Sequence, residues 1–113
     1  MNKITLPWPY KYLSPNEKGH WSKKADATKR YRFAAAALAS SARIPKSNLL
    51  SVWFYPPIRP GRTPDRDNMI ASFKAGQDGI ADAMGVDDRN FVVSYGFGDS
   101  VKHGAVVVEI IEP

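Results

Sequence analysis

Cysteine is absent from the 113 residues of this chain, and histidine occurs only at His20 and His103. The lack of cysteine excludes disulfides, thiolate metal sites and cysteine nucleophiles, and it fits a reducing compartment. No apolar run approaches the roughly 20 residues of a membrane span, and the first residues lack the apolar core of a signal peptide. The sequence predicts one cytoplasmic domain over residues 1–113 with no membrane partner.

Acidic side chains are scarce in the first half of the chain. Residues 1–62 contain twelve Lys and Arg against two acids, a net charge of +10, whereas residues 63–113 contain four against nine, a net −5. Six of the eleven acids lie between Asp65 and Asp88. A basic surface around a compact acidic cluster indicates a polyanionic substrate and a hard metal ion.

Hydrophobic periodicity and turn residues predict the order β-α-β-α-β-β. Pro7 and Pro9 place the first strand at an edge or an end of the sheet, and residues 99–104 predict a hairpin between the last two strands. The fold class is α/β (α+β), with a small mixed sheet covered by two helices. The predicted strands are 4–6, 49–55, 91–97 and 105–111, the helices are 26–43 and 68–84, and the loops are 10–24 and 56–64.

At 100° per residue, the predicted helix 68–84 has three faces: an apolar core face, a charged stripe and a face of small residues. Its charged stripe has two interpretations, a solvated face with a weak Lys74–Asp78 pair or part of a site. Its small face contains two glycines that each cost about 1 kcal/mol in a helix, which indicates close packing against another helix. The core face is Met69, Ile70, Phe73, Ile80 and Met84, the charged stripe is Asp67, Lys74, Asp78 and Asp82, and the small face is Ser72, Gly76, Gly79 and Ala83.

Asp65 and Asp67 are two residues apart, so in an extended segment both side chains point the same way and can face one ion. The structural alternative is a helix start, with Asp67 as the N-cap and Asp65 as a turn residue. Asn68, Lys74 and the pair Asp87-Asp88 strengthen the site interpretation, because Mg²⁺ takes carboxylates and a lysine stabilises phosphate charge.

Other candidate residues are weaker. His20 and His103 are expected on the surface rather than as ligands. The tyrosines at 31, 55 and 95 lie in periodic segments and are expected to be packing residues rather than nucleophiles. Trp21 stands beside His20 and Lys23-Lys24, which suits either a surface that stacks a base or a cap over the edge of the core.

At the aspartate block the chain resembles the RusA-type Holliday junction resolvases, including their phage-borne members. The resemblance lies in Asp65-x-Asp67-Asn68, a lysine on the following helix, Asp78-Gly79-Ile80 and Gly85-Val86-Asp87-Asp88. Leu6-Pro7-Trp8-Pro9, Ser14-Pro15-Asn16 and the basic loop that follows are similar in position and type, so nearly the whole chain is covered.

The resemblance implies a homodimeric, Mg²⁺-dependent endonuclease, with Mn²⁺ as a substitute, that cuts four-way DNA junctions symmetrically in recombination and repair. It assigns Asp65, Asp67 and Asp88 as metal-binding and catalytic carboxylates, Lys74 as the supporting lysine and Asp87 as a neighbour. One departure from the family pattern is Ala71, which stands three residues after the asparagine where the family has its lysine.

The resemblance and the basic charge together predict the DNA-binding residues. Two other functions fit the same sequence: a non-catalytic basic DNA-binding module whose aspartates cap and solubilise, and a nuclease of the same fold acting on another branched DNA. The predicted DNA-binding residues are Asn16, Lys18, Trp21, Lys23, Lys24, Arg30, Arg59 and Arg62.

A distance problem affects the predicted metal site. If residues 68–84 form one unbroken helix, they span about 25 Å, which separates Asp88 from Asp65 and Asp67. Either the helix bends at Gly76–Gly79, or two subunits pack so that Asp88 of one meets Asp65 and Asp67 of the other. The small face favours the second arrangement, a composite site between subunits.

Overall fold

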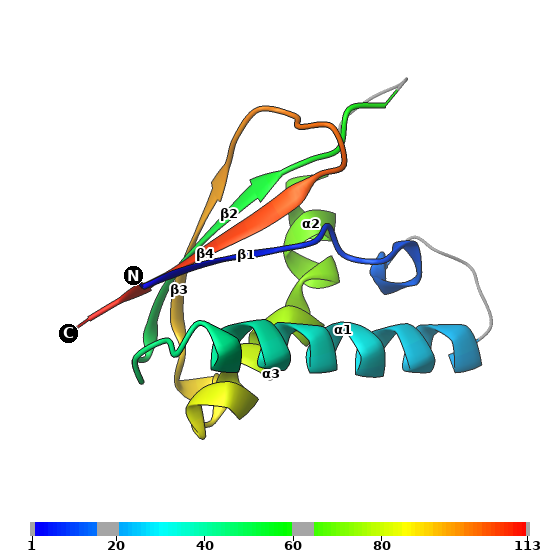
Figure 1. Cartoon of the computed structure of the whole chain (residues 1–113). Helices are drawn as coiled ribbons and strands as arrows, with labels where there is room; N and C mark the ends of the chain where they lie inside the picture. Colours follow the sequence, from blue (N-terminus) through cyan, green and yellow to red (C-terminus); the bar gives the residue numbers. More distant parts are fainter. Residues whose placement is uncertain (1, 16–20, 60–64, 113) are drawn as a thin grey trace.

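A computed structural model describes residues 2–15, 21–59 and 65–112, which form a mixed four-stranded sheet with helices packed on it (Figure 1). In the described part, no helix is long and apolar enough to cross a membrane. The elements, in chain order, are β1 (Lys3–Leu6), η1 (Lys11–Leu13), α1 (Trp21–Ser41), β2 (Leu49–Tyr55), α2 (Arg66–Ser72), α3 (Lys74–Met84), η2 (Asp88–Asn90), β3 (Val92–Phe97) and β4 (Ala105–Ile111).

The sheet has the strand order β1-β4-β2-β3, with β2 and β3 parallel and the other pairs antiparallel. The predicted mixed sheet and the edge position of β1 are therefore confirmed. The predicted hairpin is wrong, because β2 lies between β3 and β4. β4 contains an almost continuous run of β-branched residues, which suits a central strand, whereas β3 contains Ser94 and Gly96 and lies at the edge.

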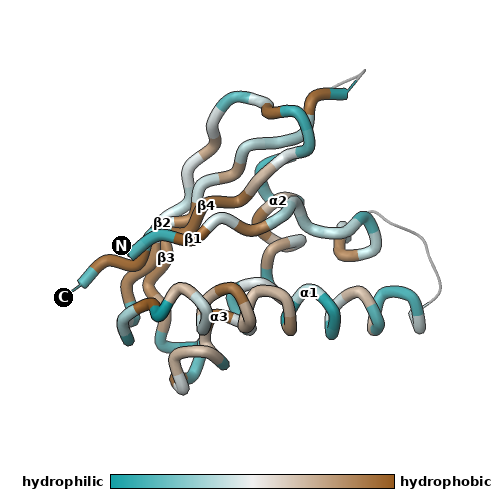
Figure 2. Tube along the Cα trace, in the orientation of Figure 1, coloured by the Kyte–Doolittle hydropathy of each residue, from teal (hydrophilic) through white to brown (hydrophobic). Residues whose placement is uncertain are grey.

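The helices cover one face of the sheet, and the core lies between them (Figures 1 and 2). Alternate residues of β2 and β4 are buried on this face, as period-two geometry requires. From α1, Tyr31 is fully buried, and its hydroxyl donates a hydrogen bond to the Pro7 carbonyl at 2.6 Å. Burial raises the pKa of Tyr31, so this tyrosine is a packing residue, as predicted.

Helix α1 begins at Trp21, so the predicted loop over residues 10–24 is wrong from residue 21 onward. The segment Trp21–Lys24 contains neither proline nor glycine, and lysine is a good helix former. The helix continues to Ser41, and the chain then turns at Arg43, whose φ of 53° is left-handed.

The predicted helix 68–84 is broken at Phe73, where α2 ends and α3 begins. Phe73 has φ −92° and ψ 0° and is fully buried against Phe54 and Tyr31, with ring centroids 5.9 and 6.1 Å apart. Just before it, the Ser72 hydroxyl donates to the Asn68 carbonyl at 2.7 Å, a contact that bends helices. The predicted bend at Gly76–Gly79 is therefore misplaced, because anchoring of an aromatic ring decides where the helix breaks.

The small face of α3 packs against α1 of the same chain. A Cβ at Gly79 would meet the Arg32 carbonyl oxygen and would lie 2.8 Å from Ala35 Cβ. Close helix packing was predicted, and the partner is α1. This face therefore no longer argues for contact with a second subunit.

Candidate active site

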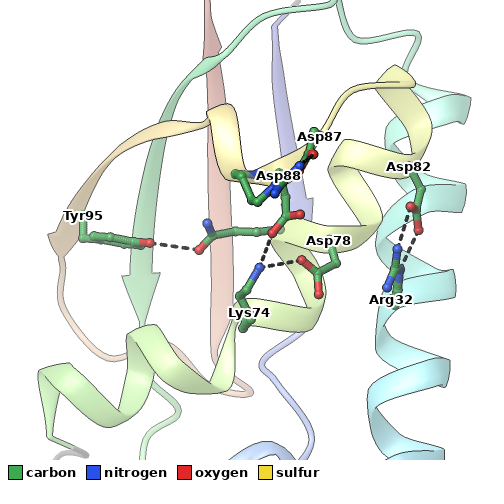
Figure 3. Close-up of polar contacts among 9 residues, drawn as sticks. Arg32, Lys74, Asp78, Asp82, Asp87, Asp88 and Tyr95 are labelled. Carbon is green, nitrogen blue, oxygen red and sulfur yellow. Dashed lines mark hydrogen bonds and ion pairs between the residues drawn. The ribbon is translucent and has the colours of Figure 1, made fainter.

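A lysine held between two carboxylates forms the centre of the site (Figure 3). Lys74 is the first residue of α3, and its Nζ donates a 2.7 Å hydrogen bond to Asp78 Oδ1, one helical turn away. The same Nζ donates to Asp88 Oδ2 from η2. Two carboxylates from different elements thus converge on one positive charge.

Hydrogen bonding favours the charged forms of Lys74 and Asp88. Burial acts to lower the pKa of Lys74, but its hydrogen bonds with Asp78 and Asp88 outweigh burial, and the pKa is raised. The hydrogen bond from Lys74 lowers the pKa of Asp88. At neutral pH the ammonium and the Asp88 carboxylate are therefore both charged.

A tight turn after α3 brings Asp88 back to the start of that helix. Gly85 adopts the left-handed conformation at φ 71°, and the Val86 amide donates to the Ala81 carbonyl at 3.1 Å, which closes the helix end. Asp87 then begins η2 by accepting the Arg89 amide at 3.0 Å and its guanidinium at 2.7 Å. These hydrogen bonds lower the pKa of Asp87, so Asp87 serves to shape the turn.

The ion pair between Arg32 and Asp82 was not predicted from the sequence. The Arg32 guanidinium donates twice to Asp82, at 2.7 and 2.8 Å, and joins α1 to α3 beside the cluster (Figure 3). Fifty residues separate the two side chains, so no local spacing could indicate the pair. A second contact between distant elements is the 2.9 Å hydrogen bond that Tyr95 Oη donates to Gln77 Oε1, which holds β3 to α3.

Asp65 and Asp67 lie at the start of α2. Asp65 is the N-cap residue with extended backbone, its side chain makes no capping hydrogen bond, and Asp67 lies in the first turn of the helix. The premise that both lie in an extended segment is therefore wrong, and so is the alternative of Asp67 as N-cap. Between them, the Arg66 guanidinium lies 4.8 Å from the centroid of the Phe97 ring, which fixes α2 against β3.

The structure brings Asp88 to Lys74 but leaves Asp65 and Asp67 outside that cluster. Across residues 2–15, 21–59 and 65–112, no group of three His, Asp or Glu side chains is arranged to hold one metal ion. The separation is nevertheless shorter than an unbroken helix implies. Because Asp88 returns to the start of α3, only α2, seven residues or about 10 Å long, lies between the two sets.

The predicted DNA-binding residues that the structure describes are solvent-exposed. Trp21 is 82% exposed, so its alternative role as a cap over the core edge is wrong. Lys23 Nζ lies 5.5 Å from the centroid of the Tyr12 ring, which gives this surface a second aromatic side chain. The described and exposed members are Trp21, Lys23, Lys24, Arg30 and Arg59, while Asn16, Lys18 and Arg62, together with His20, lie outside the described residues.

The remaining weak candidates behave as packing or surface residues. Tyr95 is half-buried and stacks on Phe54 with centroids 6.2 Å apart, and Tyr55 is half-buried at the end of β2. His103 is exposed in the connection between β3 and β4. The structure confirms Tyr95 as a packing residue and His103 as a surface residue, whereas Tyr55 lies on the sheet face opposite the core.

Comparison with known proteins identifies a relative that is longer than this chain. The chain is 46% identical over 118 aligned positions to an uncharacterized protein of Xylella fastidiosa, an alignment that covers 97% of this chain and 76% of that protein. No protein-family model matches the chain.

Proposed function

We propose that this chain, which belongs to the same family as the Xylella fastidiosa protein, is a Mg²⁺-dependent endonuclease that resolves four-way DNA junctions. The observation that carries the proposal is the convergence of Asp78 and Asp88 on the Lys74 ammonium. Asp88 and Lys74 are two of the four catalytic residues that the resemblance to the RusA-type resolvases implies. The basic half of the chain, at net +10, supplies charge for a polyanion.

The chemistry of the cluster fits a hard cation. Asp78 and Asp88 already share one positive charge, and the side chain of Asp88 is 31% exposed, so an ion from solvent could reach it. Carboxylate oxygens are the ligands that Mg²⁺ prefers. The proposed ligands are Asp65, Asp67 and Asp88, with Mn²⁺ as a substitute, and the structure adds Asp78 to them as a neighbour.

In the proposed hydrolysis of a phosphodiester, the metal site, Lys74 and the exposed cations have separate roles. Bound Mg²⁺ would supply activation of water and neutralisation of the charge that builds on the phosphate. Lys74, which is charged, is placed to offer its ammonium to a phosphate oxygen. The exposed cations of α1 and Arg59 hold the DNA backbone, which contributes affinity and register rather than sequence preference.

Two such sites in a homodimer would account for paired, symmetric cuts, because a two-fold axis relates both sites and both strands. The break at Phe73 replaces one long helix with two shorter ones between Asp65 and Asp88, which favours a site contained in one subunit.

Titration of Mg²⁺ against an end-labelled four-way junction tests the proposal, with paired nicks as the expected product. Asp65→Asn, Asp67→Asn and Asp88→Asn should each abolish nicking while junction binding persists or tightens, since the amide keeps the shape and removes negative charge. Asp99→Asn, at an exposed acid outside the site, is the matched control and should cut normally. Near wild-type cutting by any of the three would remove that residue from the site.

A second candidate, a non-catalytic DNA-binding module, is favoured by one observation. The carboxylates of Asp78, Asp82, Asp87 and Asp88 are all paired with cations of the chain itself. This function predicts junction binding without nicks at any concentration of Mg²⁺ or Mn²⁺. Cleavage of three-way forks or flaps in preference to four-way junctions would instead indicate a nuclease for another branched DNA.

A further inference from the structure

A cavity of about 290 Å³ lies between the β1–η1 connection, α2 and the segment after β2. Its volume is at the lower end of the range for small-molecule sites, roughly 300–1,000 Å³, so it admits one small group and excludes a duplex. None of the aspartates of the candidate active site lines it, although α2, which has Asp65 as its N-cap and Asp67 in its first turn, forms one wall.

The aromatic wall of the cavity is held rigidly. Trp8 packs edge-on against Phe54, with centroids 6.2 Å apart, and against Gly104, where a Cβ would lie 2.9 Å from Trp8 Cβ. Tyr10 packs edge-on against Tyr31, with centroids 5.1 Å apart. Both rings are half-buried and held by neighbouring rings, so little side-chain entropy is lost when a planar group stacks on the Trp8 ring.

The polar wall is cationic. Lys11 and Arg59 line the cavity, and the described residues around it include neither Asp nor Glu. No ion pair involving Lys11 or Arg59 occurs in the described part of the chain. Hydrogen bonds between Ile58 and Val101, at 3.0 Å, and between Val101 and Pro56, at 2.9 Å, anchor the segment that ends at Arg59.

The third component of the cavity wall is the side-chain amide of Asn68. The side chain of Asn68, on α2, lines the cavity and has no hydrogen-bond partner among the described residues, while its carbonyl is occupied by Ser72. A free side-chain amide offers two donors and an acceptor, the pattern that reads the edge of a base.

We propose that this cavity binds one unstacked nucleotide, with its phosphate on Arg59 and Lys11, its base on Trp8 and the base edge at Asn68. The nucleotide comes from the DNA substrate, at a branch point where pairing is already lost, and this source rests on the proposed function. Unpairing is least costly at such positions, so the cavity would recognise a branched DNA rather than a continuous duplex.

The first test needs neither metal nor cleavage. The full-length ¹⁵N-labelled protein is titrated with 2′-deoxyadenosine 5′-monophosphate or with deoxyadenosine, and the three tryptophan indole resonances are followed. The expected result is a shift at Trp8 and at the Asn68 amide, with Trp21 and Trp53 unchanged. Deoxyadenosine should bind at least about tenfold more weakly, because it lacks the charge-assisted phosphate contacts.

Arg59→Gln should remove the difference between the two ligands. Lys46→Gln is the matched control, since Lys46 is an exposed cation just before β2, at the end opposite Arg59, and this variant should bind like the wild type. Absence of any Trp8 shift, or an equal loss in both variants, would overturn the proposal.

The second test identifies the source of the nucleotide. Binding is measured in EDTA to a duplex with one unpaired nucleotide and to the fully paired duplex. Tighter binding to the first, abolished by Arg59→Gln and kept by Lys46→Gln, supports the proposal. If the monophosphate shifts Trp8 but the unpaired nucleotide confers no advantage, the cavity takes a free nucleotide and the DNA source is wrong. None of these binding measurements requires cleavage. Failure of the proposed nuclease activity can therefore be distinguished from failure of the cavity to bind a nucleotide.

Discussion

At the scale of single residues, the acidic side chains divide into those that hold the fold and those that remain available for chemistry. Asp82 and Asp87 pair with arginines and belong to the first group. Asp65 and Asp67 are exposed and belong to the second, since their side chains make no hydrogen bond or ion pair within the described residues. Asp88 belongs to both groups. Its ion pair with Lys74 fixes its position in the fold, and Lys74 is the proposed catalytic lysine.

The Arg32–Asp82 pair makes a testable, pH-dependent contribution to stability. The hydrogen bond from Arg32 lowers the pKa of Asp82 below its ordinary 3.8. A carboxyl whose pKa is depressed in the folded state stabilises the protein above its unfolded pKa, and this stability is lost as the pH falls below 3.8. Asp82→Asn should therefore lower the free energy of unfolding at pH 7 by less than about 1 kcal/mol, since both side chains are nearly half exposed.

Urea denaturation from pH 7 down to pH 3 measures this effect. The difference between wild type and variant should shrink below pH 3.8, and in an Arg32→Gln background it should be absent at pH 7. A difference that grows as the pH falls would contradict the assignment.

At the scale of elements, periodicity predicted most of the fold. β2 and β4 have the predicted bounds, β3 begins one residue later than predicted, and α1 is displaced by a few residues. The agreement is close because alternation and helix propensity are local properties. The break at Phe73 and the place of β4 between β1 and β2 depend on tertiary packing, which no window of sequence contains. The contacts of the candidate active site also have local and tertiary origins. Spacing of four residues predicted the Lys74–Asp78 pair, whereas the Lys74–Asp88 pair depends on the turn at Gly85.

The contact between α1 and α3 yields a prediction of its own. Gly79→Ala would gain about 0.8–1.0 kcal/mol from helix propensity, yet the added Cβ would overlap the Arg32 backbone. We expect a net destabilisation of about 1–3 kcal/mol, as for other overpacked cores, measured by urea or thermal denaturation. Ala35→Leu, at the same contact, should also destabilise, while Ala37→Leu on the exposed side of α1 should not. Stabilisation by Gly79→Ala would contradict this prediction, because it would show that α1 and α3 move apart to accommodate the added methyl group.

At the scale of the whole molecule, the charge asymmetry predicts how junction binding responds to salt. Each phosphate neutralised contributes about −0.9 to the slope of log K against log salt on duplex arms, and we expect a slope steeper than about −2. Lys23→Gln with Lys24→Gln should make the slope shallower by about 2 and reduce affinity without moving the cut position. Lys46→Gln serves as the control. An unchanged slope in the double variant would place these lysines outside the interface.

A complementation experiment tests how the two subunits of the proposed dimer would share the active site. The structure removes the two arguments for a composite site. The helix is broken, and the two glycines of its small face pack within the chain, Gly79 against α1 and Gly76 against the Phe73 ring. A verified heterodimer of Asp65→Asn and Asp88→Asn chains should therefore remain inactive, because each subunit carries one defect in its own site. Single-strand nicking by that heterodimer would establish a site shared between subunits. A heterodimer of wild-type and doubly substituted chains is the control and should nick one strand.

The position of β4 also determines when this protein can fold in the cell. β4 is the strand that joins β1 to β2, and it is the last of the strands to be synthesised. At 5–20 residues per second, β1 is synthesised roughly 5 to 20 seconds before β4, its neighbour in the described sheet. During that interval the apolar side chains of Ile4 and Leu6, buried in the finished sheet, have nothing to pair with. The described sheet can therefore close only once synthesis has passed Ile111.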